Sequence, residues 1–239
     1  MKTSPKAVTS KLRNIVLFWG FGASGAAGLI YEVAWQRAIT NTIGSTSYSI
    51  SILFAAFMAG LAIGSHFSGK WFINQKDFVK IFGRLQLATA FFGLATYFLI
   101  NNLQPVYGGI HGLVSQNPIL FNLSQMILVF AVLLMPTTLM GASLPVIIEA
   151  WMLRVRDAGQ TAGDMYSINT WGAAAGALAA GFILVPLLGL RATNLAAVLI
   201  NLLLALGAFI AAGLSPPLRK TVKKPAVGIV AEPAGGQKA

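Results

Sequence analysis

The sequence has no cysteine, only two histidines and few acidic side chains among its 239 residues. Without cysteine there is no disulfide, no thiolate metal site and no cysteine nucleophile. His66 and His111 alone supply too few imidazoles for a transition-metal or haem site, so we expect no metal and no cofactor. Charged residues make up 10% of the chain, against about 25% in ordinary soluble domains. This scarcity of charge argues against a soluble protein.

Hydrophobic residues make up 56% of the chain and gather in long stretches. A helix that crosses about 30 Å of hydrocarbon at 1.5 Å per residue needs roughly 20 apolar residues. Six stretches reach that length: 14–40, 46–73, 80–101, 119–151, 162–187 and 191–213. The sequence therefore predicts an all-α fold, a polytopic membrane bundle of six transmembrane helices.

Lysine and arginine alternate between the two ends of these stretches. Only Arg37 and Arg191, of 17 basic residues, fall on the side opposite to the termini. Because short cytoplasmic loops carry the excess of positive charge, we expect the inner membrane with both termini cytoplasmic. We expect a basic tail over 1–13, a six-span domain over 14–213 and a disordered basic tail over 214–239. The basic residues that give the net charge of +11 lie at the ends of the predicted spans and in the tails. This position at the membrane surface indicates lipid headgroups rather than nucleic acid as partners.

Acidic residues inside a bilayer require an explanation, because inserting each one costs several kcal/mol of free energy on insertion scales. Glu32 lies in the first stretch, followed by Gln36 and Arg37. One interpretation is an interfacial cluster near the outer leaflet, with Trp35 in the aromatic belt. The other is an inward-facing carboxylate that binds a cation. Glu149 and Asp164 flank the loop with Arg154, Arg156 and Asp157, where we expect a structural cluster of ion pairs.

The fourth stretch contains Pro136 and Pro145. Each proline removes one helical hydrogen bond and frees the carbonyl four residues earlier, near 132 and 141. Thr137, Thr138 and Ser143 are placed to bond to freed backbone. Such a broken helix either lines a cavity, as at transporter sites, or only shapes the packing. In the fifth and sixth stretches, the polar side chains that could bond between helices are Asn169, Thr170 and Asn201.

Small residues four apart remove bulk from one helix face and let backbones approach closely. They predict tight helix contacts at Gly20, Ser24 and Gly28, at Gly60 and Gly64, and at Gly172 and Gly176. The pattern does not say whether the partner helix belongs to the same chain.

Catalytic signatures are missing from the sequence. It contains no dinucleotide or phosphate loop, no metalloprotease motif and no serine–histidine–aspartate set on a soluble scaffold. From this we expect that the chain is not an enzyme and has no catalytic residue.

Four runs of the sequence resemble the membrane region of the fused major-facilitator-like/spermidine synthase proteins. They are SGAAGLIYEVAWQR at 24–37, AAFMAGLAIGS at 55–65, TTLMGASLP at 137–145 and YSINTWGAAAGALAAG at 166–181. The resemblance implies a bundle like half of a major facilitator transporter. In that family the membrane region is usually joined to a cytoplasmic domain similar to spermidine synthase. The binding glycines and acidic catalytic residues of that domain do not occur in these 239 residues, which leaves open a separately encoded partner that performs the transfer.

Three functions follow from these patterns. The first is a non-catalytic membrane subunit or scaffold that packs against a larger membrane complex or anchors a separately encoded transferase. The second is a homodimeric half-transporter for a cationic metabolite such as a polyamine, with candidate site residues Glu32, Gln36, Arg37, Thr137, Thr138 and Asn169. The third is the membrane part of a split aminopropyl- or methyltransferase.

Overall fold

The structure, a computed structural model, describes residues 5–44, 47–72, 77–114, 116–152 and 158–213. Its elements are α1 (Pro5–Ile43), α2 (Ser47–Phe72), α3 (Phe78–Asn101), α4 (Leu103–Val114), α5 (Pro118–Met152), α6 (Ala158–Ala179), the π-helical turn η1 (Ala180–Leu184) and α7 (Val185–Gly213). No strand occurs in these ranges. The all-helical fold expected from the sequence is confirmed.

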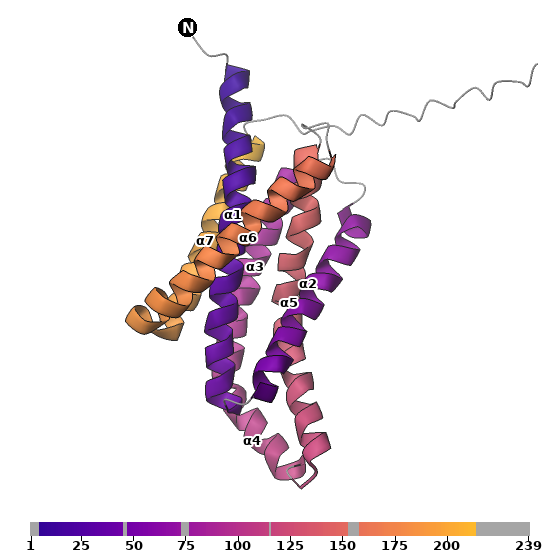
Figure 1. The fold of residues 1–239 in the computed structure, drawn as a ribbon, viewed down its shortest axis with the longest axis vertical. Coiled ribbons are helices and arrows are strands. Elements are labelled where there is room, and N and C mark those ends of the chain that lie inside the picture. Colours follow the sequence, from indigo (N-terminus) through magenta and orange to yellow (C-terminus); the bar gives the residue numbers. More distant parts are fainter. Residues whose placement is uncertain (1–4, 45–46, 73–76, 115, 153–157, 214–239) are drawn as a thin grey trace, which may run out of the picture.

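The long helices run alternately up and down (Figure 1). The start of α1, the end of α2, the end of α5 and the end of α7 lie at one end of the bundle. The end of α1, the start of α2 and the turn that joins α6 to α7 lie toward the other end, where α4 sits beside the start of α5. Lys70, Lys80 and Arg84 therefore share the end at which α1 begins, whereas Arg37 lies near the opposite end of α1.

Four segments of the described chain are long and apolar enough to cross a membrane: Ile50–Phe72, Phe78–Asn101, Ile119–Trp151 and Ala162–Gly213. The first expected span, 14–40, lies within α1 and is not among these four segments. The last segment has 52 residues and contains two of the expected spans. It folds back on itself at Gly189, whose φ of 77° and ψ of 173° break the helix in a region that only glycine adopts freely.

The expected tails coincide only in part with described residues. Helix α1 begins at Pro5, so the helix extends back into the predicted N-terminal tail 1–13. The predicted C-terminal tail 214–239 lies outside the described residues, as do Arg154, Arg156 and Asp157 of the predicted ion-pair cluster.

Two helix crossings bring backbone against backbone. A Cβ on Gly172 of α6 would overlap the Gly22 carbonyl of α1, and a Cβ on Gly64 of α2 would overlap the Thr138 carbonyl of α5. Glycine permits both contacts because it has no side chain. The partner helices of Gly60, Gly64, Gly172 and Gly176 therefore belong to the same chain.

The two crossings repeat one pattern. A Cβ on Gly25 of α1 would overlap the Asn169 carbonyl, and a Cβ on Gly141 of α5 would overlap the Leu61 carbonyl. In each crossing, two contact positions on one helix are three residues apart and face two positions on the other helix that are also three residues apart. In α1 and α5 these positions are Gly22 and Gly25, and Thr138 and Gly141. In α6 and α2 they are Asn169 and Gly172, and Leu61 and Gly64. Since α1 and α5 run in opposite directions (Figure 1), the α1–α6 and α2–α5 crossings are equivalent and inverted.

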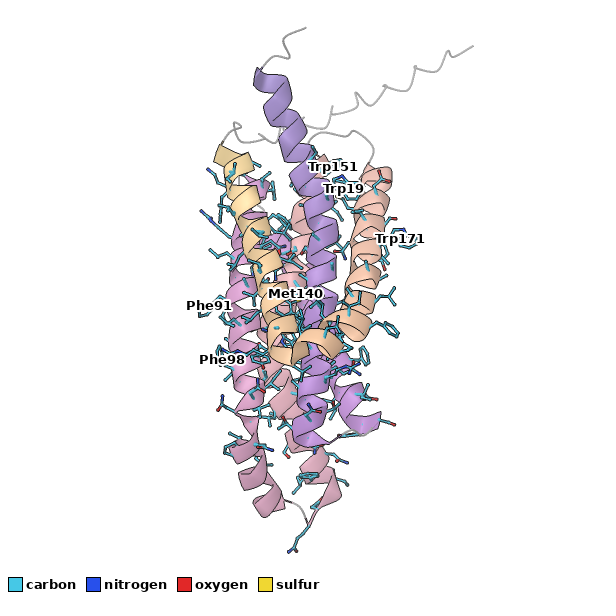
Figure 2. The ribbon with its side chains drawn as sticks, turned by 90° about the vertical axis from the view of Figure 1, so that its left-hand side faces the viewer. Trp19, Phe91, Phe98, Met140, Trp151 and Trp171 are labelled. Carbon is cyan, nitrogen blue, oxygen red and sulfur yellow. The ribbon has the colours of Figure 1, made fainter. Side chains whose placement is uncertain are left out.

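Large apolar side chains cover much of the outer surface. Phe91 and Phe98 project from α3, and Trp171, which is 75% exposed, projects from α6 (Figure 2). Such a surface in water would be a liability, whereas in a bilayer lipid chains solvate it. The exposed apolar surface therefore agrees with a membrane protein.

Candidate functional site

A cavity of about 360 Å³ lies where the two crossings meet. Its walls come from α1, α2, α5 and α6: Phe21, Ser24, Gly25, Gly28, Leu29, Phe57, Leu61, Ala62, Ser65, Met140, Gly141, Leu144, Tyr166 and Asn169. Met140 lies in the middle of the bundle in Figure 2. The volume falls within the range of small-molecule sites. Gly28 contributes to this space, because no atom lies within 4 Å of the position of a Cβ there.

Four polar side chains line this cavity. Ser24 Oγ accepts a hydrogen bond of 2.9 Å from Gln86 Nε2 of α3. The side chains of Ser65, Tyr166 and Asn169 make no hydrogen bond with any residue in the described ranges. These three groups can therefore bind a ligand without giving up an existing contact.

Glu32 lies on the cavity side of α1. Residues three and four apart share a helix face, and Phe21, Gly25 and Gly28 all line the cavity. Glu32 follows Gly28 by four positions and Gly25 by seven, so it continues that face toward the end of α1. Its side chain is 5% exposed and forms no hydrogen bond or ion pair with the described part of the chain.

A neighbouring face of α1 is held by a buried polar network. Trp35 Nε1 donates to Asn194 Oδ1 of α7 at 2.9 Å, and Asn201 Nδ2 donates to the Tyr31 hydroxyl at 3.3 Å. The rings of Tyr31 and Trp35 stack with centroids 4.9 Å apart. Gly93 of α3 makes room for Tyr31, because a Cβ there would overlap its ring. Trp35 is fully buried here, which excludes the aromatic-belt role suggested for it.

The two prolines of α5 have different surroundings, although α5 stays helical through both. Pro136 has no N–H for the Val132 carbonyl, and Thr96 Oγ1 of α3 donates to that carbonyl instead at 3.4 Å. Thr137 bonds back to the Leu133 carbonyl at 2.7 Å. Pro145 leaves the carbonyl of Gly141 without its helical donor, and Gly141 lines the cavity. The first break is therefore filled by a neighbouring helix, and the second adjoins the cavity.

The remaining candidate residues are spread over the bundle. Gln36 is half-buried near the end of α1, and Arg37 is exposed. Thr137 is fully buried against Gly60, while Thr138 lines a groove along α5. Of the six candidates, only Asn169 lines the cavity, whereas Glu32 and then Gln36 continue the same face of α1 beyond it.

The small residues of α1 have three different surroundings. Gly20 lies against Leu204 of α7, and Ser24 bonds to Gln86. Gly28 has no atom within 4 Å of the position of a Cβ, because it faces the cavity. Gly22 and Gly25, which the four-residue pattern did not single out, make the close contacts with α6.

Glu149 and Asp164 lie near the basic end of the bundle. Glu149 lines a separate cavity of about 270 Å³ between α2, α3 and α5, and Asp164 is exposed on α6. In the same region, Lys80 Nζ and Asp77 Oδ2 form an ion pair 3.8 Å apart. Asp77 Oδ1 also accepts from the backbone N–H of Lys80 at the start of α3.

Sequence reasoning missed Ser65, Tyr166 and Phe57 as cavity residues and Asn194 as the partner of Trp35. Ser65 and Tyr166 lie at the ends of two runs that resemble the family, but nothing in their spacing relates them to each other. In the described ranges no three histidine, aspartate or glutamate side chains gather as a metal site would require.

The sequence is similar to one curated protein, polyamine aminopropyltransferase 2 of Streptomyces coelicolor. The two are 27% identical over 175 residues, which are 71% of this chain and 29% of that protein. The chain thus matches less than a third of the length of its relative. No family model matches the sequence, and no solved structure matches it.

This similarity corrects one expectation. Missing catalytic motifs led us to expect that the chain is not an enzyme, whereas the protein it resembles is an aminopropyltransferase. The reasoning failed because the absence of motifs of soluble active sites does not exclude that a chain is related to an enzyme. The similarity also supports the spermidine-synthase side of the family resemblance.

Proposed function

We propose that the chain is the membrane-embedded region of a polyamine aminopropyltransferase, acting with a transferase domain that lies on the same or a separate polypeptide. The observation that carries this proposal is the similarity over 71% of the chain to an enzyme of that activity. The bundle would hold the transfer reaction at the inner membrane. Its basic end, with Lys70, Lys80 and Arg84, would face the cytoplasm.

The helix arrangement supports a bundle of the half major-facilitator type. The crossings of α1 with α6 and of α2 with α5 are equivalent and inverted, as expected for a three-plus-three inverted repeat. In such folds, ligand sites lie between the repeats, and a cavity lined by Gly25 of α1 and Gly141 of α5 is consistent with this arrangement.

The test compares membranes from cells with and without this gene. Washed membranes receive an aminopropyl donor and a polyamine acceptor, and the lengthened product is measured by mass spectrometry. We expect product formation by the membrane fraction to fall at least tenfold without the gene and to return when the chain is restored. Equal product formation by both membranes would refute the proposal.

A second candidate function is binding and passage of an organic cation through the bundle. Glu32 favours this candidate. Its carboxylate is buried and has no partner in the described chain, and an ionisable side chain inside a membrane usually serves a function. In vesicles that contain the purified chain, Glu32→Gln should abolish uptake of a labelled polyamine. Asp164→Asn removes a carboxylate of the same kind from an exposed position, and it should leave uptake unchanged. Uptake that is equal in wild type and Glu32→Gln would exclude this candidate.

A further inference from the structure

We propose that Glu32 and the cavity between α1, α2, α5 and α6 form one elongated binding site for an unbranched organic cation with an amino group at each end. The proposal rests on the second candidate function and adds the place, the shape and the chemical class of the ligand. It is argued from the wall of α1, from the charge of Glu32 and from the polar groups at the other end of the cavity.

The carboxylate of Glu32 forms one end of this site. Glu32 is four positions beyond Gly28 on the same face of α1, so it lies about one helical turn, roughly 5.4 Å, past the wall of the cavity. The cavity is open beside Gly28, since no atom lies within 4 Å of the position of a Cβ there. A ligand in the cavity can therefore reach toward Glu32 along α1.

Charge decides what binds at that end. Glu32 is 5% exposed and has no hydrogen-bonding or ionic partner among the described residues. Taking an unpaired carboxylate out of water costs several kcal/mol, and a cation in direct contact offsets that cost. A primary ammonium suits the position because it donates three hydrogen bonds and is small.

The other end of the site offers acceptors without a formal charge. Ser65, Tyr166 and Asn169 bring three polar groups that make no hydrogen bond within the described ranges, and Pro145 leaves the carbonyl of Gly141 without its helical donor. The ring of Phe21 also lines this end, and aromatic faces attract ammonium groups. No lysine or arginine lines the cavity to repel a second cationic group.

The length of the site suits an extended ligand. The volume of the cavity is about 360 Å³, and from Ser24 to Glu32 the helix rises about 12 Å. An extended, unbranched diamine of comparable length, such as 1,8-diaminooctane, spans this distance.

The test measures binding to the purified full-length chain in lipid nanodiscs, with empty nanodiscs subtracted. The probes are radiolabelled 1,8-diaminooctane and 8-amino-1-octanol, which has the same length and one amino group. We expect the diamine to bind at least tenfold more tightly than the amino alcohol. We expect Glu32→Gln to weaken diamine binding at least tenfold and Asp164→Asn to leave it unchanged.

A second pair of variants tests the cavity itself. Gly28→Leu places a side chain into open space, so it should fold and should abolish diamine binding. Gly207→Leu makes the same change where a Cβ also meets nothing within 4 Å but far from the cavity walls, and it should bind as wild type does. Equal binding of the two probes would overturn the proposal, as would wild-type affinity in Glu32→Gln or in Gly28→Leu. These assays measure no aminopropyl transfer, so their failure is distinct from failure of the proposed membrane role of a transferase.

Discussion

Trp35 and Asn194 are 159 positions apart in the sequence, and the indole Nε1 of the first donates a hydrogen bond of 2.9 Å to Oδ1 of the second. Both side chains are buried, and Asn194 Nδ2 also donates to the Gly93 carbonyl of α3 at 3.4 Å. One asparagine therefore connects α7 to α1 and α3 beside the face of α1 that lines the cavity.

This relationship predicts the effect of Asn194→Leu. The substitution leaves a buried indole N–H without its acceptor, which costs about 1–3 kcal/mol, more than the average of about 0.6 kcal/mol for a hydrogen bond between membrane helices. We expect thermal unfolding in nanodiscs at a clearly lower temperature. Asn101→Leu is the control, because exposed Asn101 bonds only within its own helix, to the Tyr97 carbonyl. A shift no larger than that of the control would contradict the importance of the network.

The helix crossing at Gly172 gives a second prediction. In Gly172→Ala the new Cβ meets the backbone carbonyl of Gly22, and backbone cannot move aside as a flexible side chain does. Overpacking of this kind costs about 1–3 kcal/mol. Gly163→Ala, on the same helix but with no atom within 4 Å of the new Cβ, should unfold at the wild-type temperature or above it. If the two variants unfold alike, α1 and α6 do not pack as closely as described.

Thr96 and Pro136 should be coupled. Thr96→Val removes the donor to the Val132 carbonyl, and the lost hydrogen bond is worth about 0.6 kcal/mol. Pro136→Ala gives that carbonyl its helical N–H back, so Thr96→Val should cost less stability in the Pro136→Ala background. A double-mutant cycle on unfolding free energies measures the difference. Additive effects would mean that Thr96 does not substitute for the missing N–H.

The orientation in the membrane can be tested by single cysteines, because the chain has no cysteine of its own. We expect an impermeant maleimide added to intact cells to label Asn101→Cys. It should label Lys80→Cys only after the membrane is opened, because α3 begins at the basic end. The reverse pattern of labelling would refute the assignment of the termini to the cytoplasm.

The sequence by itself determined the helical class, the lengths of most helices and the end of the bundle that carries the positive charge. These features depend on local hydropathy and on residue type, because a chain in lipid must satisfy its backbone hydrogen bonds within each segment. It also located both proline breaks near 132 and 141, since the missing N–H of a proline affects a carbonyl at a fixed distance along the chain.

Only the tertiary structure decided what those features do. Nothing in the sequence related Thr96 to the carbonyl of Val132, or Asn194 to Trp35, because each pair joins residues from helices far apart in the chain. The same limit applies to the glycines: Gly172 closes a helix contact while Gly28 opens a cavity, although both occur in four-residue repeats of small residues. Which side of a helix meets a neighbour is fixed by how all helices pack together, and that packing placed Glu32 on the face of α1 that lines the cavity, one turn beyond it.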